Sequence, residues 1–245
     1  MKERLQKLLA QHGLGSRREI ERWISDGRIK VNGKVAELGL QASSEDKIQI
    51  DGRLVKFHHK KSELPRVLIY HKPDGEICTA HDPENRPTVF ENLPKISSGK
   101  WVMIGRLDVT TSGLLLFTDD GELANRLMHP KYELEREYAV RVFGEVTDDM
   151  LEKLKRGVKL EDGMASFDDV QFAGGTGANR WYNVTLHRGK NREVRRLWES
   201  QNVTVSRLMR IRYGSIFLPK GLRMGQYREL DEKEVKALLS QLSKS

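Results

Sequence analysis

Two short apolar repeats with helical spacing open the chain. Apolar residues recur at intervals of three and four in residues 5–9 and again in residues 20–24, and a glycine follows each repeat within a few positions. Ser16 precedes the second repeat, and Glu19 lies three residues after it, which is the spacing of a capping box. The pattern predicts two short helices, the second beginning directly after Ser16.

The following residues predict a β-hairpin. Short runs at 29–31 and 34–36 flank an Asn-Gly pair, which is favoured in a type I′ turn. A further strand is predicted at 47–50. Residues 56–65 lack periodicity and are interpreted as a linker. We therefore expect an N-terminal domain over residues 1–60 and a second domain over residues 61–245.

The second domain mixes strands with a few helices. Residues 74–94 are rich in turn formers and predict a long loop, which inside a domain is often functional. Strands are predicted in the apolar run after residue 108 and at 67–70, 101–104, 137–143, 181–187 and 210–213. Helices are predicted at 122–128, at 192–200 and, as a final exposed helix, at 232–242. This order predicts an α+β fold with a largely antiparallel mixed sheet.

Composition narrows the class of protein. The longest apolar stretch, residues 113–117, is far shorter than a membrane span of roughly 20 residues. The N-terminal residues have no apolar core of the signal-peptide kind. The chain has one cysteine, which excludes a disulfide framework within it. We expect a cytoplasmic protein without a membrane partner.

The charge is basic and concentrated in two zones. The net charge is +8, which favours a polyanionic partner. Residues 1–60 hold 13 Lys/Arg against 8 Asp/Glu, and residues 186–212 hold 8 against 2. Two basic zones on an otherwise slightly acidic chain fit a phosphate backbone. They also fit two solvated helical faces, and that alternative stays open.

The segment 105–116 carries the candidate chemistry. Asp108 lies between a predicted strand and a Thr/Ser/Gly stretch, where backbone N–H groups can keep a carboxylate ionised and nucleophilic. Arg106 lies two residues earlier, so in extended backbone the two side chains project to one side. Aspartate is also common in turns without any catalytic role. No metal site is expected, since Asp119-Asp120 suits a tight turn and His58-His59 has no matching ligand cluster.

The N-terminal domain contains two basic motifs, Gly-Ser-Arg-Arg-Glu at 15–19 and Gly-Arg-Ile-Lys-Val-Asn-Gly at 27–33. With these motifs the domain resembles the S4 RNA-binding domain. It implies that Arg17, Arg18 and Arg28 contact the phosphates of a structured RNA, contacts that position the partner without reading its sequence. Solvating surface arginines are the alternative.

The second domain contains four distinctive motifs: Gly-Arg-Leu-Asp at 105–108, Thr-Ser-Gly-Leu-Leu-Leu at 111–116, Asn-Arg-Leu-Met-His-Pro at 125–130 and Arg-Glu-Tyr-Ala-Val at 136–140. With these motifs it resembles the small-subunit-type family of bacterial ribosomal RNA pseudouridine synthases. Within the family it is most similar to the large-subunit synthase B group, through segments 78–82, 86–90, 118–124, 191–198 and 211–214. With the S4 module the resemblance extends over essentially the whole chain.

The resemblance implies the isomerisation of a specific uridine in 23S ribosomal RNA, free or in an assembling large subunit, by a monomer without a cofactor or metal. The uridine is flipped into a pocket, and Asp108 assists cleavage of its N1–C1′ bond. Tyr138 would pack against the uracil and serve as a base, Arg195 would pair with Asp108, and Arg106 would help to splay out the nucleotide. Arg192 and Arg196 would bind RNA.

Plainer interpretations remain beside these roles. Tyr138 also fits a core aromatic residue, and Arg195 one of several phosphate-contacting arginines. His129 is interpreted as structural because it ends a predicted helix before Pro130. For the whole chain, the rival hypothesis is a non-catalytic S4-type RNA-binding or ribosome-assembly factor. A metal-dependent RNA hydrolase is disfavoured because paired carboxylates and a histidine cluster are missing at workable spacing.

Overall fold

The computed structural model describes residues 2–57, 64–96 and 99–242. Its contacts divide the chain into two compact units, which are described separately. The smaller unit comprises residues 1–65, 94–102 and 119–121, and the larger unit comprises residues 66–93, 103–118 and 122–245.

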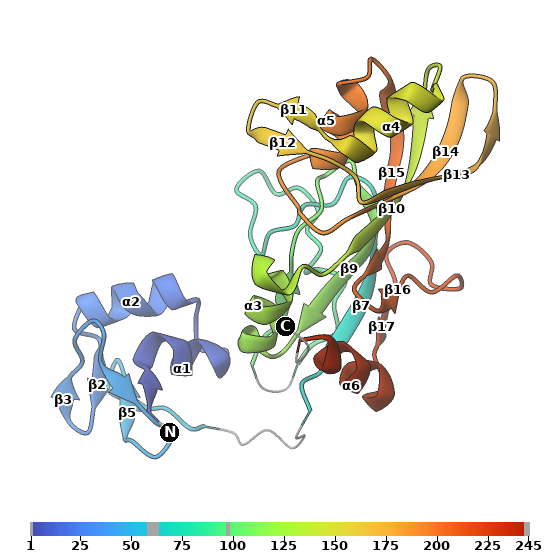
Figure 1. Ribbon diagram of the computed structural model, residues 1–245. Coiled ribbons are helices and arrows are strands. Elements are labelled where there is room, and N and C mark those ends of the chain that lie inside the picture. The colour runs from blue at the N-terminus through green and yellow to red at the C-terminus, as the bar shows by residue number, and fades with distance from the viewer. Residues whose placement is uncertain (1, 58–63, 97–98, 243–245) are drawn as a thin grey trace. The chain divides into compact units, whose positions relative to one another are not determined.

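The smaller unit combines two helices with short antiparallel strands (Figure 1). Helix α1 spans Leu5–Gln11 and helix α2 spans Arg17–Ser25. The strands are β1 (Glu3–Arg4), β2 (Ile29–Val31), β3 (Lys34–Val35), β4 (Gln41–Ala42), β5 (Ile48–Ile50) and β6 (Arg53–Leu54). Four of them form a sheet in the order β3-β2-β5-β6, and β1 pairs with β4.

Local sequence determines much of this unit. The Ser16 side chain accepts from the Glu19 backbone N–H, and the Glu19 carboxylate accepts from the Ser16 N–H, so the expected capping box is confirmed. The Asn32-Gly33 turn has φ values of 51° and 84°, as a type I′ hairpin requires. The apolar stripes of both helices pack on the sheet, with Leu5, Leu9 and Ile20 fully buried.

The larger unit contains a nine-stranded sheet. Its main path runs β13-β14-β10-β15-β9-β7-β17, with β16 beside β15 and β8 beside β9. The bounds are β7 (Val67–Lys72), β8 (Val102–Ile104), β9 (Ser112–Thr118), β10 (Arg136–Phe143), β13 (Asp169–Thr176), β14 (Asn179–Leu186), β15 (Thr204–Tyr213), β16 (Ile216–Phe217) and β17 (Tyr227–Glu229). Along this path β9 and β15 are parallel and the other neighbours are antiparallel. The expected α+β class with a mostly antiparallel mixed sheet is confirmed.

Helices and a second small sheet accompany this sheet (Figure 1). They are α3 (Gly121–Met128), the 3-10 helix η1 (Pro130–Tyr132), α4 (Asp148–Arg156), the β11–β12 pair (Val158–Leu160 and Gly163–Ala165), α5 (Glu193–Glu199) and α6 (Glu232–Gln241). An apolar core between α4, α5 and strands β10, β14 and β15 is centred on Trp198, with Phe167 and Tyr182 against it. This core anchors α5, whose N-terminal residues border the site described below.

Some expectations were wrong or incomplete. The final helix is not exposed throughout, because Val235 and Leu238 on one face are buried. Residues 148–156 form a helix, and residues 169–176 a strand, that the sequence pattern did not predict. Strand β15 begins six residues before the expected start at residue 210.

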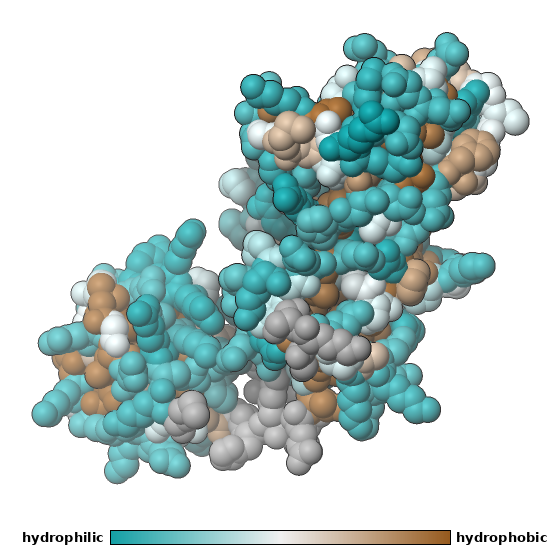
Figure 2. Space-filling model, viewed as in Figure 1, coloured by the Kyte–Doolittle hydropathy of each residue, from teal (hydrophilic) through white to brown (hydrophobic). Residues whose placement is uncertain are grey.

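Most of the surface that faces the viewer in Figure 2 is hydrophilic, with apolar side chains in small patches. None of the helices within residues 2–57, 64–96 and 99–242 has the length and apolar character of a membrane span.

Candidate active site

A cavity of about 350 Å³ opens in the larger unit, next to Asp108. Its walls come from three parts of the fold: the segment before β9, the facing ends of strands β10, β14 and β15, and the loop that leads into α5. The predicted residues Arg106, Asp108, Tyr138 and Arg192 all line it. Arg195 and Arg196 do not appear among the lining residues.

A close contact between strands fixes the position of the segment before β9. Gly113 pairs with Arg210 in the parallel ladder between β9 and β15. A Cβ atom at Gly113 would lie 2.3 Å from the Arg210 carbonyl oxygen, and Gly113 has a φ of 103°. Only glycine suits both the conformation and the approach. This contact holds Asp108, five residues earlier, beside the strand that carries Arg210.

Residues 107–111, here called the Asp108 turn, are held by a buried cation. The Lys72 ammonium group is fully buried and donates to the carbonyl oxygens of Val109 (3.3 Å), Thr111 (2.9 Å) and Pro73 (2.9 Å). Burial lowers the pKa of Lys72, and nearby acids that include Asp108 act in the opposite direction. Lys72 therefore both fixes the turn and supplies positive charge close to the aspartate.

Two further contacts hold the same turn. The Leu107 backbone N–H donates to the Cys78 sulfur at 3.4 Å, and burial raises the pKa of the Cys78 thiol. The Gly75 N–H donates to the Val109 carbonyl oxygen at 2.9 Å. The loop 74–94 thus supports the Asp108 turn, a role that no individual residue of the loop indicates in the sequence.

Arg195 contributes differently from the expectation. It was expected to pair with Asp108, but the ion pairs found within the described residues do not include one between them. Its guanidinium instead donates to the carbonyl oxygens of Thr110 (2.7 Å) and Val205 (3.0 Å). Burial lowers the pKa of Arg195, and the Asp108 charge opposes that shift, so the two groups interact at longer range. Arg195 therefore connects the Asp108 turn to the start of β15.

The carboxylate itself is left open. Asp108 is half-buried, and its side chain makes no hydrogen bond or ion pair to another of the described residues. The expected backbone N–H groups that would hold it are therefore not found, although its carbonyl oxygen accepts from the Thr111 N–H at 3.0 Å. The fixed main chain and the open carboxylate leave both side-chain oxygens available to a bound molecule.

The cavity walls combine apolar and basic side chains. Tyr138 is half-buried on β10, in register with Val184 of β14 and Arg210 of β15. The buried Leu186 and Leu208 provide apolar surface beside it. The basic lining residues are Arg106, Arg136, Lys190, Arg192 and Arg210, and the acidic ones are Asp108 and Glu193. The cavity therefore suits a planar ring attached to an anionic backbone.

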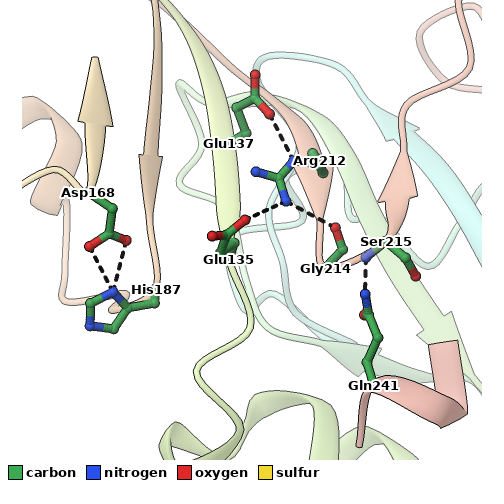
Figure 3. A network of polar contacts seen from close by, with 8 residues as sticks. All are labelled: Glu135, Glu137, Asp168, His187, Arg212, Gly214, Ser215 and Gln241. Carbon is green, nitrogen blue, oxygen red and sulfur yellow. Dashed lines mark hydrogen bonds and ion pairs between the residues drawn. The ribbon is translucent and has the colours of Figure 1, made fainter. Parts of the chain in front are cut away.

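Several arginines of the second basic zone have structural partners. Figure 3 shows Arg212 of β15 bound to Glu137 of β10 and to Glu135 just before that strand, at 2.8 and 2.9 Å. Arg196, expected to bind RNA, forms a two-bonded ion pair with Asp162 at 2.9 and 3.0 Å. Fewer basic side chains of this zone are therefore available to phosphates than the number of basic residues in it indicates.

Arg192 has a special backbone position. It precedes α5 in the left-handed region, with a φ of 49°, and its exposed side chain approaches Glu199 at 3.8 Å. A contact of that length between exposed groups is weak. Arg192 therefore lines the cavity with a guanidinium that a phosphate could take over.

The predicted residues of the smaller unit differ in their surroundings. Arg17 and Arg18 are exposed at the start of α2 and form no ion pair within the described residues. Arg28 forms a two-bonded pair with Asp51 and lies over the Trp23 ring at 5.3 Å. The first two are therefore free for phosphates, whereas Arg28 has to leave or share its carboxylate.

No three His, Cys, Asp or Glu side chains gather as metal ligands would in the part of the chain that the structure describes. The His58-His59 pair lies outside the described residues. His129 caps η1 by accepting from the Lys131 N–H at 3.2 Å, in agreement with the structural role expected for it.

Comparison with known proteins identifies the family. The family model described as RNA pseudouridylate synthase matches residues 66–200. The chain belongs to this family. A second model, the S4 domain, matches residues 3–48. The family expected from the sequence is therefore confirmed.

Similar proteins extend this result. The ribosomal large subunit pseudouridine synthase B of Pseudomonas aeruginosa is 57% identical over 237 residues, which cover 96% of this chain and 61% of that protein. The protein of the same name from Escherichia coli K12 is 60% identical over 233 residues, with 94% and 80% covered. A crystal structure of a pseudouridylate synthase superposes with a TM-score of 0.66 at 27% identity, covering 96% of this chain and 99% of that one. The chain thus spans less than two thirds of the Pseudomonas relative's length.

Proposed function

We propose that this chain isomerises a specific uridine of large-subunit ribosomal RNA to pseudouridine, with Asp108 as the nucleophile and without a cofactor or metal ion. One observation carries the proposal: an open carboxylate on a fixed turn borders a cavity lined by Tyr138 and five basic side chains. The family supports the reaction, and the names of the similar bacterial proteins support the large subunit.

The reaction needs a base and sugar held against Asp108. The flipped uridine would enter the cavity with its ring against Tyr138 and Leu208. Asp108 would then assist cleavage of N1–C1′, either by attacking C1′ or through a route in which the 2′ proton is lost. The freed uracil anion turns and C5 bonds to C1′, which releases the Asp108 carboxylate on the first route and is accompanied by return of a proton to C2′ on the second. The C5 proton then passes to a base, and N1 gains a proton. Substrate and product are isomers, so no oxidant or group donor is required.

The neighbouring residues fit supporting roles. Tyr138 would stack on the uracil and act as a base. Arg195 would keep the Asp108 turn rigid and place positive charge near the carboxylate. Arg106 is exposed at the cavity and would hold the target nucleotide out of its stack.

The smaller unit would bind RNA as an S4 module. We propose a boundary near residue 60, with a catalytic domain over residues 61–245, in keeping with the ranges of the two family models. Arg17 and Arg18 would contact phosphates, with Arg28, Arg192 and Arg196 adding contacts where their acidic partners yield. We further propose that the protein acts on ribosomal RNA as a monomer and that it does so in the cytoplasm.

The rival hypothesis, an RNA-binding or ribosome-assembly factor without activity, does not account for the cavity. A surface that only binds phosphates gains nothing from a carboxylate on a turn held by two buried cations, because that charge repels phosphate. The proposed reaction requires such a group.

The test compares Asp108→Asn with Asp148→Asn, a control on the exposed start of α4. Release of tritium from uracil C5 in ribosomal RNA reports isomerisation, and filter binding reports affinity. We expect Asp108→Asn to lose at least about 10³-fold in rate with little change in affinity, since it removes the nucleophile and keeps the shape. Equal turnover by wild type and Asp108→Asn would refute the assignment.

A further inference from the structure

Two guanidinium groups lie on one aromatic ring at the cavity. Arg136 and Arg210 are 5.1 and 5.2 Å from the centre of the Tyr213 ring, within the range of cation–π contacts. Tyr213 is buried, and its hydroxyl donates to the Leu127 carbonyl oxygen at 2.8 Å. Both arginines line the cavity. The ring therefore holds two cations beside each other at the same site.

The two arginines differ in how many of their donors are used. Arg136 donates to the carbonyl oxygens of His187 (2.7 Å) and Arg188 (3.2 Å) and to the Tyr213 hydroxyl (3.3 Å). Arg210 makes one hydrogen bond, from Nε to the Leu114 carbonyl oxygen at 2.8 Å. Its Nη2 is buried without a partner, and Arg210 joins no ion pair within the described residues. Arg210 thus has spare donors and an uncompensated charge.

The burial of Arg210 makes its unpaired charge unusual. Arg210 is only 2% exposed, and a buried cation is costly unless a partner satisfies it. Its backbone lies between Tyr138 of β10 and Gly113 of β9 in the sheet register, so it is next to both the ring-stacking residue and the Asp108 turn. Phosphates meet the exposed lining residues first. A group that reaches Arg210 has to enter the cavity, as a flipped base does.

We propose that the Arg210 guanidinium binds a carbonyl oxygen of the flipped uracil and bears the negative charge that forms on the ring when the N1–C1′ bond breaks. This inference rests on the proposed isomerase function and extends it by naming the residue that binds the leaving base. Arg210 is then a catalytic residue in addition to Asp108.

The charge follows from the electron count. As N1–C1′ breaks, its electron pair stays on N1, and resonance spreads the charge over O2 and O4. C1′ is taken by Asp108, or it forms a double bond to C2′ after loss of the 2′ proton. Both routes leave the same uracil anion. A positive group in a site shielded from water stabilises that anion more than the neutral bound base, which lowers the barrier.

The test is a double-mutant cycle between protein and substrate. Arg210→Met removes the charge and keeps most of the side-chain volume. The RNA carries uridine, 2-thiouridine or 4-thiouridine at the target position, because sulfur is a poor hydrogen-bond acceptor. Single-turnover rates are measured by nucleoside chromatography after digestion. Sulfur alters the intrinsic reactivity of the base for every variant, so only the interaction between the two changes is interpreted.

We expect Arg210→Met to slow the uridine reaction about 100-fold, as loss of one oxyanion donor does. One of the two thio substitutions should cost the wild type much more than it costs Arg210→Met. Arg207→Met, an exposed position on the same strand, should respond to sulfur as the wild type does. Arg210→Lys keeps the charge and should retain part of the wild-type rate. It provides the test if Arg210→Met fails to fold.

Thio effects that are the same in wild type and in the Arg210 variants would overturn the proposal. A wild type that forms no pseudouridine from the uridine RNA would instead refute the proposed function, so the two failures are distinguishable.

Discussion

The close contact between Gly113 and Arg210 predicts a large effect of one added methyl group. In Gly113→Ala the new Cβ would lie 2.3 Å from the Arg210 carbonyl oxygen and 2.7 Å from its nitrogen. Ordinary contacts begin near 3.4 Å, so β9 and β15 have to separate by about 1 Å. The positive φ adds backbone strain of about 1–3 kcal/mol. We expect Gly113→Ala to lower the free energy of unfolding by about 2–6 kcal/mol, the sum of this strain and of about 1–3 kcal/mol of overpacking.

Gly174→Ala is a matched control. Gly174 has a φ of 114°, close to the 103° of Gly113, but its added Cβ would meet no atom within 4 Å. The control therefore carries the strain without the clash and should cost only the strain, about 1–3 kcal/mol. Urea unfolding, followed by tryptophan fluorescence, measures both values.

Activity should separate the two variants further. A shift of about 1 Å in the strand that follows the Asp108 turn should slow isomerisation roughly 100-fold, since catalysis depends on sub-ångström placement. Gly174 lies on β13, outside the cavity lining, and its variant should retain the wild-type rate. Equal stability and equal activity of the two variants would show that the contact between β9 and β15 does not position Asp108.

Two other residues give separate predictions. Lys72→Met removes the donor to the Thr111 and Pro73 carbonyl oxygens, each worth about 1–3 kcal/mol when left unpaired, so unfolding should occur at lower urea and turnover should fall; unchanged turnover would contradict the role of Lys72 in holding the turn. Hydrogen bonds from Arg86 lower the pKa of Asp82 to about 2, below the unfolded value of about 3.9. The stabilisation by Asp82 should therefore be complete above about pH 4 and disappear as the pH falls through about 2. The difference in melting temperature between wild type and Asp82→Asn should narrow over that interval, and a constant difference would argue against the ion pair.

The features that the sequence predicted well depend on neighbouring residues. The capping box of α2 and the hairpin turn at Asn32 are decided within a few positions, and the structure has both. Helix α4 was missed although Met150, Leu151 and Leu154 recur at helical spacing and the Thr147 side chain caps the helix, so its signal is local and was overlooked. Strand β13 was missed because Gly174 and Gly175 interrupt its alternation.

The candidate site shows the same difference between features set by neighbouring residues and features set by tertiary contacts. Its motif and family resemblance located Asp108 and Tyr138, and the fold brings both to one cavity. Lys72 and Arg210 were not singled out, because their importance depends on carbonyl oxygens far away in sequence. Arg196 was assigned to RNA, but whether a basic side chain is free depends on its neighbours, here Asp162. Composition gives the number of cations, whereas tertiary packing decides which of them remain available.

The parallel pairing of β9 with β15 also determines when the cavity beside Asp108 is completed during synthesis. Arg210 and Leu114, joined by a hydrogen bond across this pairing, are 96 residues apart in the chain. A nascent polypeptide therefore presents its aspartate long before the strand that completes the pocket exists, and closing so long a loop is slow. Any fragment that ends before Thr204 lacks Leu208 and Arg210, and therefore part of the cavity wall. The proposed catalytic capacity should consequently arise in one step, once the polypeptide from Thr204 onward has folded.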